Sequence, residues 1–178
     1  YLMTTIVDRK VSKKYLNLYK ENDHHVMFSS LGFGTAAIDI LNYLGLEATE
    51  KAVIFSVQEE DKWTHIKRQL QRKLHIDAPG GGIAFIVPLI SIGGKKSLQF
   101  LLEKQEYQKE EESTLKDTAH ELIIVIANQG NIEMVMDAAR GAGAYGGTVI
   151  HARGTGMEMA EEFLGFSLAS QKEMLFFV

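Results

Sequence analysis

The chain has 178 residues, of which 46% are hydrophobic and 24% charged, and it contains no cysteine. This length fits one domain or two small ones, and the missing cysteines exclude disulfides, thiolate metal sites and thiol catalysis. A formal net charge of −4 disfavours a broad nucleic-acid or anionic-membrane surface. No apolar run approaches the roughly 18–20 residues of a membrane helix, so we expect a cytoplasmic protein that does not insert into membranes.

The hydrophobic pattern of the first half predicts alternating strands and helices. Apolar residues recur with helical spacing over 11–19, and a second stripe, beginning with Trp63 as a core residue, follows Asp61 as the expected N-cap. The order is β-α-β-β-α-β, which predicts an α+β, ferredoxin-like fold with a four-stranded antiparallel sheet covered by two helices. The expected strands are Leu2–Val7, Val26–Leu31, Ala52–Val57 and Ile83–Ser91.

Two adjacent glycines, Gly93 and Gly94, end this first module, 1–94, and a charged helical connector is expected at 95–118. The remainder, 119–178, repeats the plan as far as its third strand and lacks the last helix and strand. Either another protomer covers the sheet surface left open by the missing elements, or the natural chain extends beyond Val178, and we favour the second. The elements expected here are strands at Glu121–Ala127, Gly147–Ala152 and Glu173–Val178, with a helix at Ile132–Arg140.

The two halves also match in sequence. Leu31-Gly-Phe-Gly-Thr35 aligns with His151-Ala-Arg-Gly-Thr155 at an offset of 120 residues. An ordered series of four matching segments favours two copies of one module over a chance similarity. The other matches are Gly45 with Gly165, Glu50–Val57 with Gln171–Val178 after one inserted residue, and Thr4–Val7 with Leu122–Val125 across a small gap.

The second copy carries the run Gly-Gly-Thr-Val-Ile-His-Ala-Arg-Gly-Thr-Gly at 146–156, followed by Ala-Glu-Glu-Phe-Leu-Gly-Phe at 160–166. With Gln171–Val178, these stretches resemble the nitrogen regulatory P-II signalling family, in particular the branch with a His-Ala-Arg-Gly-Thr-Gly stretch. In the first copy, Ile76–Phe85 lies where that family has its glycine-rich B-loop. The resemblance covers both copies and implies a ferredoxin-like fold for each.

The resemblance implies a non-enzymatic regulator that forms homo-oligomers and acts on a protein partner. From the residues themselves we expect no catalytic residue and no metal site. The resemblance also implies an adenine nucleotide (ATP, ADP or AMP) as effector, held in a cleft between neighbouring subunits or modules. Glycines let backbone N–H groups approach phosphates, and an arginine adds bidentate contacts. The implied nucleotide-binding residues are Gly32, Phe33, Gly34 and Thr35 of the first T-loop base, Arg153, Gly154, Thr155 and Gly156 of the second, and Gly80, Gly81 and Gly82 of the B-loop.

Departures from the family pattern keep a second interpretation open. The segment Ala36–Glu50 is short and half helical where the family has a long T-loop, and the B-loop carries Asp77 and no lysine. On this interpretation the glycine loops are purely structural, and the protein is an assembly module that binds no nucleotide. Side chains of adjacent residues on an extended segment point to opposite faces, so His24 and His25 do not predict a joint metal site.

Overall fold

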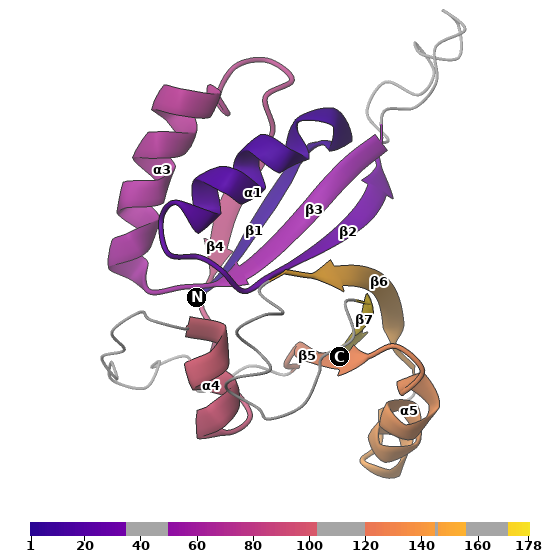
Figure 1. Ribbon diagram of the computed structural model, residues 1–178. Helices are drawn as coiled ribbons and strands as arrows, with labels where there is room; N and C mark the ends of the chain where they lie inside the picture. The colour runs from indigo at the N-terminus through magenta and orange to yellow at the C-terminus, as the bar shows by residue number, and fades with distance from the viewer. Residues whose placement is uncertain (35–49, 103–119, 145, 156–170) are drawn as a thin grey trace, which may run out of the picture. The chain divides into compact units, whose positions relative to one another are not determined.

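The computed structural model describes residues 1–34, 50–102, 120–144, 146–155 and 171–178 (Figure 1). The chain divides into two units, Tyr1–Tyr107 and Gln108–Val178. It is an α+β protein in which the strands of each unit pair antiparallel. The amphipathic turn expected at Ala36–Glu50 and most of the expected connector lie outside the described residues.

The first unit confirms the predicted alternation of strands and helices. The antiparallel pairings give the strand order β4-β1-β3-β2, and α1 and α3 lie on one face of the sheet (Figure 1). The elements are β1 (Leu2–Asp8), a 3-10 turn (Arg9–Val11), α1 (Ser12–Lys20), β2 (Met27–Phe33), β3 (Glu50–Val57), α3 (Glu60–Leu74) and β4 (Ile83–Val87).

Two sequence predictions about element ends were wrong. The N-cap of α3 is Glu59, which makes no side-chain cap, whereas Asp61 lies in the first turn and its Oδ1 accepts a hydrogen bond from the Lys62 backbone N–H at 2.7 Å. Strand β4 ends at Val87 and does not continue to Ser91. Pro88 follows directly, and a proline cannot donate to the hydrogen-bond ladder.

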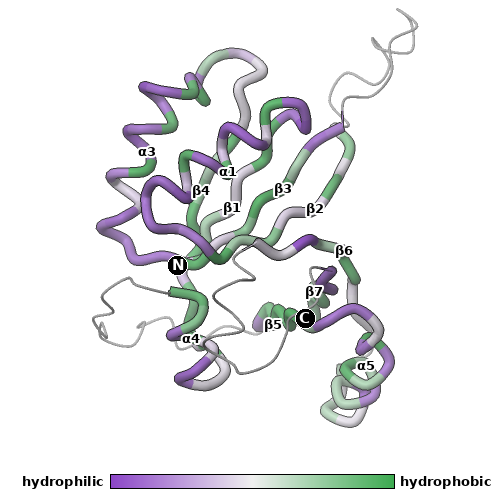
Figure 2. Tube along the Cα trace, viewed as in Figure 1, coloured by the Kyte–Doolittle hydropathy of each residue, from purple (hydrophilic) through white to green (hydrophobic). Residues whose placement is uncertain are grey.

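The core of this unit lies between the sheet and the two helices. Figure 2 shows hydrophobic stretches along β1 and β3, whereas α3 is mainly hydrophilic and has short hydrophobic stretches. Trp63, predicted as a core residue, is only half-buried and packs against the core cluster. The cluster consists of Met3 and Val7 from β1, Tyr15, Leu18 and Tyr19 from α1, Met27 from β2, Ala52 and Ile54 from β3, and Ile66 and Leu70 from α3.

The outer strand β4 also carries apolar side chains on the other face of the sheet. Ala84 and Ile86 face the helices and pack against the core, while the alternate residues Ile83, Phe85 and Val87 are 61%, 40% and 44% exposed. Beyond β4, the described part of the connector forms the helix α4 (Lys95–Leu102), as predicted. Among the described residues, no helix combines the length and apolar character needed to cross a membrane.

The second unit contains β5 (Ile123–Asn128), α5 (Ile132–Gly141), β6 (Thr148–Gly154) and β7 (Gln171–Phe177). Strand β7 pairs with both β6 and β5, which gives the order β6-β7-β5. The stretch β1-α1-β2-β3 has the same element order, and β3 likewise pairs with both β2 and β1. All four elements predicted for this region are therefore present.

The ladders of the two units also share one register. Lys51 lies opposite Gly32 in the first unit, and Lys172 lies opposite Ala152 in the second. These are the pairs that the 120-residue offset and the single inserted residue make equivalent. In the other ladder, Ile123 lies opposite Phe177 as Met3 lies opposite Ser56. The offset of 120 thus extends to β5, and the gapped alignment of Thr4–Val7 with Leu122–Val125 is wrong by two residues.

A buried hydrogen bond ties β1 to α1. Thr5 Oγ1 and the Tyr19 hydroxyl lie 2.6 Å apart, and neither residue is exposed. Tyr19→Phe would leave the Thr5 hydroxyl buried without this partner, and we expect it to lower the free energy of unfolding by about 1–3 kcal/mol. The double variant Thr5→Val/Tyr19→Phe should recover most of the loss in chemical denaturation. A single variant as stable as the parent would contradict this role of the hydrogen bond.

A second buried polar group makes stability depend on pH. His24 is 1% exposed. Burial is the main cause that lowers its pKa to about 4; the Lys62 ammonium and His25 add to this effect, and the Asp23 carboxylate opposes it. The unfolded chain, with an ordinary histidine pKa near 6.5, binds more protons than the folded protein between these values.

The stability of the parent protein should therefore fall, relative to that of His24→Leu, as the pH drops from about 6.5 to about 4. The full difference amounts to about 3 kcal/mol, because each pKa unit corresponds to about 1.4 kcal/mol. Urea unfolding of both proteins at several pH values measures it. Parallel pH profiles for the two proteins would show that His24 does not titrate differently on folding.

Candidate functional site

Two of the glycine loops predicted from the sequence lie at the same end of the first sheet. Because neighbouring strands of this sheet run antiparallel, β1 and β2 end where β3 and β4 begin. The cross-strand pairs Asp8–Lys51, Phe33–Glu50 and Ile6–Ile83 show this. Gly32 and Gly34 therefore lie at the same end as Gly80–Gly82. We call this end of the strands the glycine end of the sheet.

Within this unit the two loops do not form a single site. They belong to the outer strands β2 and β4, and the strands β1 and β3 lie between them. Three strand spacings correspond to about 14 Å. The two loops of this unit are therefore too far apart to contact the same phosphate group.

The loop before β4 contains two glycines that the fold itself requires. A Cβ at Gly81 would lie 2.6 Å from the carbonyl oxygens of His75 and Ile76. Gly82 has a φ of +137°, and its Cβ would lie 2.7 Å from the Ile6 carbonyl oxygen. The Tyr15 hydroxyl also donates a hydrogen bond to the Gly81 carbonyl at 3.1 Å. Packing therefore accounts for both glycines without a ligand.

Gly80 and Gly32 differ from these two glycines. Gly80 has a φ of +80°, but no heavy atom lies within 4 Å of the position that a Cβ would take, so only its backbone conformation favours glycine. Gly32 has neither constraint, because the nearest atom to its Cβ position would be Val53 Cγ2 at 4.0 Å. The neighbouring Phe33 side chain is 70% exposed. The fold thus leaves open space above Gly32, where a ligand could approach the backbone.

Two cations at the glycine end were missed in the sequence analysis. Lys51 lies directly opposite Gly32, and its Nζ is 4.0 Å from Asp8 Oδ2. Arg9 Nη1 lies 2.6 Å from Glu50 Oε2. A signal was available for Lys51, because a lysine occupies the equivalent position, 172, in the second copy. Both cations are next to carboxylates, which reduces the net positive charge available to an anion.

The second unit repeats part of this arrangement. Arg153 is exposed on β6 opposite Gln171, Gly154 ends that strand, and Thr155 follows it half-buried. Lys172 Nζ donates a hydrogen bond to Asn128 Oδ1, and these two positions are equivalent to Lys51 and Asp8. Burial lowers the pKa of Lys172. Thr35 and Gly156, also predicted as site residues, lie outside the described residues.

The two adjacent histidines behave differently from each other. His24 is buried, whereas His25 is only half-buried and its Nε2 lies 4.0 Å from Asp23 Oδ1. No group of three or more histidine, aspartate or glutamate side chains is placed to hold a metal ion in the part of the chain that the structure describes.

Comparisons of the chain with protein-family models, with curated proteins and with solved structures found no match.

The difference between the glycines gives a stability prediction. We expect Gly82→Ala to destabilise the protein by about 1–3 kcal/mol from backbone strain alone, with the clash at Ile6 adding to it. Gly32→Ala should leave stability unchanged or raise it by up to about 1 kcal/mol, because alanine is more favourable than glycine within a strand. Urea unfolding compares the two. Equal losses in both variants would show that Gly32 is also a structural glycine.

Proposed function

We propose that the protein is a non-enzymatic regulator of the nitrogen regulatory P-II type that binds an adenine nucleotide at the glycine ends of its modules. The observation that carries the proposal is Gly32, a glycine that packing does not require, directly opposite the cation Lys51. A backbone segment without side chain beside a lysine is suited to bind a phosphate group.

The architecture supports two ferredoxin-like modules, at 1–94 and 119–178, with 95–118 as the connector. The strand order β4-β1-β3-β2 with two helices on one face is the arrangement expected for this fold. The second unit repeats the ladder of β1, β2 and β3 in the same register. Even the polar pair Asp8–Lys51 has its counterpart in Asn128–Lys172.

The parts of the proposed site have distinct roles. Backbone groups of Gly32, Gly34 and Gly80 would approach the phosphates, and the exposed Phe33 ring could stack on the base. In the second copy the exposed Arg153 replaces Phe33 and offers a bidentate contact to phosphate. Since the two loops of the first unit are too far apart to contact the same phosphate group, each nucleotide would lie in a cleft shared by two modules or subunits.

A homo-oligomer would also cover the apolar side chains of β4. Ile83, Phe85 and Val87 alternate with the core-facing Ala84 and Ile86, so they are exposed on the sheet face that points away from the helices. An apolar surface on a regular strand is typical of an interface with another copy or with a partner protein. Nucleotide binding at the module boundary would then change the affinity for a regulated protein, by a coupling of typically 1–3 kcal/mol.

A second candidate function is an assembly module without nucleotide. Two observations favour it: Gly81 and Gly82 are explained by packing, and Asp8 and Glu50 lie against the two cations of the glycine end. The second candidate needs the same exposed strand face but no ligand. A binding measurement therefore separates the two.

The test is a titration of the full chain with ATP, ADP and AMP, followed by calorimetry and by thermal unfolding. A nucleotide at a hundred times its dissociation constant should stabilise the fold by about 2.7 kcal/mol. We expect Gly32→Ala, Lys51→Met and Arg153→Ala each to weaken binding at least tenfold. Lys14→Met, which removes an exposed lysine from α1, is the matched control and should bind as the parent does.

The outcomes distinguish the two functions. No binding of any of the three nucleotides would contradict the proposal and leave the assembly module as the better account. Binding that is unchanged in Gly32→Ala and Lys51→Met would show that the nucleotide lies elsewhere.

A further inference from the structure

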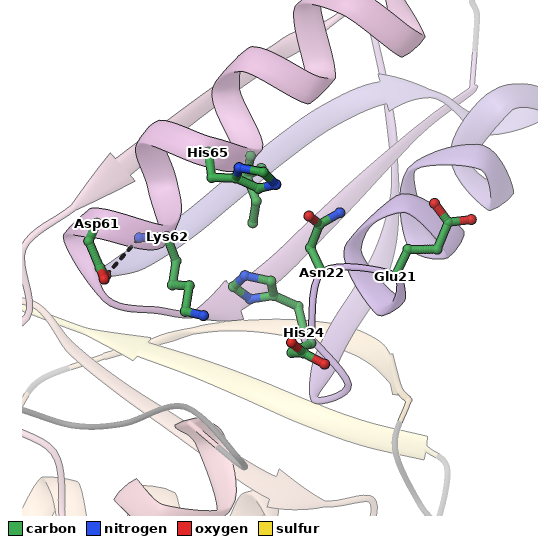
Figure 3. Close-up of a pocket in the computed structure, with 8 residues that line it drawn as sticks. Glu21, Asn22, His24, Asp61, Lys62 and His65 are labelled. Atoms are coloured by element: carbon green, nitrogen blue, oxygen red, sulfur yellow. Dashed lines mark hydrogen bonds between the residues drawn. The ribbon is translucent and has the colours of Figure 1, made fainter.

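A cavity of about 390 Å³ lies at the end of the first sheet opposite the glycine end, between the turn after α1 and the first turns of α3 (Figure 3). It is separate from the proposed nucleotide site and does not depend on it. Its volume falls in the range of small-molecule sites. The lining residues are Glu21, Asn22, Asp23, His24, Asp61, Lys62, His65 and Ile66.

One side chain in this cavity is buried without a polar partner. His24 is 1% exposed, and neither of its ring nitrogens has a hydrogen-bond partner. Its backbone N–H donates to the Tyr19 carbonyl at 3.0 Å, and its ring meets the Tyr19 ring edge-on with centroids 6.5 Å apart. These contacts hold the imidazole where Figure 3 shows it, facing the space between Lys62 and Asn22. Buried polar groups normally have partners, so two unsatisfied nitrogens indicate a missing one.

The other polar groups of the cavity divide into paired and unpaired ones. Glu21 Oε2 lies 3.8 Å from Lys73 Nζ, and Asp23 Oδ1 lies 4.0 Å from His25 Nε2. Asp61 Oδ1 accepts a hydrogen bond from the Lys62 backbone N–H. By contrast, the Lys62 ammonium forms no ion pair with any side chain that the structure describes. Among the hydrogen-bond donors of the cavity, the Lys62 ammonium and the His24 ring are therefore the two that lack a side-chain partner among the described residues.

A hydrogen-bond network fixes the side of the cavity that Asn22 and His65 form. The Gln69 side-chain amide donates to Asn22 Oδ1 at 2.6 Å and lies 2.5 Å from His65 Nε2. The Asn22 amide donates in turn to the Leu18 carbonyl at 2.6 Å. This network leaves Gln69 Oε1 as a further buried acceptor without a partner. The wall is thus ordered before a ligand arrives, which lowers the entropic cost of binding.

We propose that this cavity binds a small organic monocarboxylate, whose carboxylate group accepts hydrogen bonds from the Lys62 ammonium and the His24 ring. A monoanion is favoured over a phosphate or a dicarboxylate, because Glu21, Asp23 and Asp61 add negative charge around the cavity. The carboxylate of the ligand would supply the partner that His24 lacks.

Binding should then be coupled to proton uptake. A carboxylate beside His24 favours the charged ring and offsets the burial that lowers the pKa of His24 to about 4. The Lys62 ammonium and His25 act against protonation, the Asp23 carboxylate favours it, and Glu21, Asp61 and His65 also face the cavity. If the bound complex restores the ordinary value near 6.5, the ligand binds about tenfold more tightly at pH 5.5 than at pH 7.5.

The experiment uses the full chain with labelled histidine and follows the His24 ring by NMR during titration with propionate at pH 5.5 and 7.5. We expect a saturable shift of the His24 signals, a raised His24 pKa and tighter binding at the lower pH. Propionamide, the neutral analogue, should bind at least tenfold more weakly at both pH values, and so should succinate at pH 7.5, where it is a dianion.

Variants on α3 provide the controls. Lys62→Met should abolish the propionate effect, and Lys62→Arg should retain most of it. Lys67→Met removes an exposed lysine of the same helix that lies outside this cavity, and it should bind as the parent does. The backbone NMR spectrum of each variant shows whether it is folded.

Three results would overturn the proposal: no shift of His24 at any soluble concentration of propionate, equal binding of propionamide, or unchanged binding in a folded Lys62→Met variant. The first would leave a water molecule as the partner of His24. The second would indicate a site for neutral polar molecules.

Discussion

The antiparallel ladder of β1, β3 and β2 is the constraint on which the rest of the structure depends. Thr5 at the centre of β1 lies between Ile54 of β3 and Ala84 of β4, so this strand ties the sheet together. Side chains alternate along each strand, and a slip by one residue would turn the core residues Met3 and Val7 to the opposite face. The same register sets which residues reach each end of the sheet, and so it places the glycines at one end and His24 near the other.

Some of the unusual residues of this unit are required by packing, and others are not. Gly81 and Gly82 are needed because their backbone passes too close to other chain atoms for a side chain. Packing explains neither Gly32 nor the His24 ring. Gly32 has open space at the position of a Cβ and lies opposite a lysine, and the buried His24 ring nitrogens have no hydrogen-bond partner. Features that packing does not explain are the better guides to function. They lower the stability of the fold, and proteins retain such features mainly at functional sites.

The sequence was enough to predict the elements and their order, because their hydrophobic periods are strong and glycine or proline marks their ends. Where it failed, a local signal was overridden by local geometry: Asp61 has the chemistry of an N-cap, yet α3 begins one residue before it. The glycine loops were found by sequence, but Lys51 was not, because its position opposite Gly32 depends on pairing between strands. The cavity at His24 was also missed, since it combines residues of α3 with the turn after α1, which are far apart in the sequence.

The central claim is that one module occurs twice in this chain with a constant register. Cross-strand nuclear Overhauser effects between β5 and β7, measured on the full chain, test it most directly. The account predicts backbone contacts of Ile123 with Phe177 and of Val125 with Leu175, as the equivalent pairs in β1 and β3 require. Contacts of Ile123 with Leu175 would place β5 two residues away from this register and contradict the account.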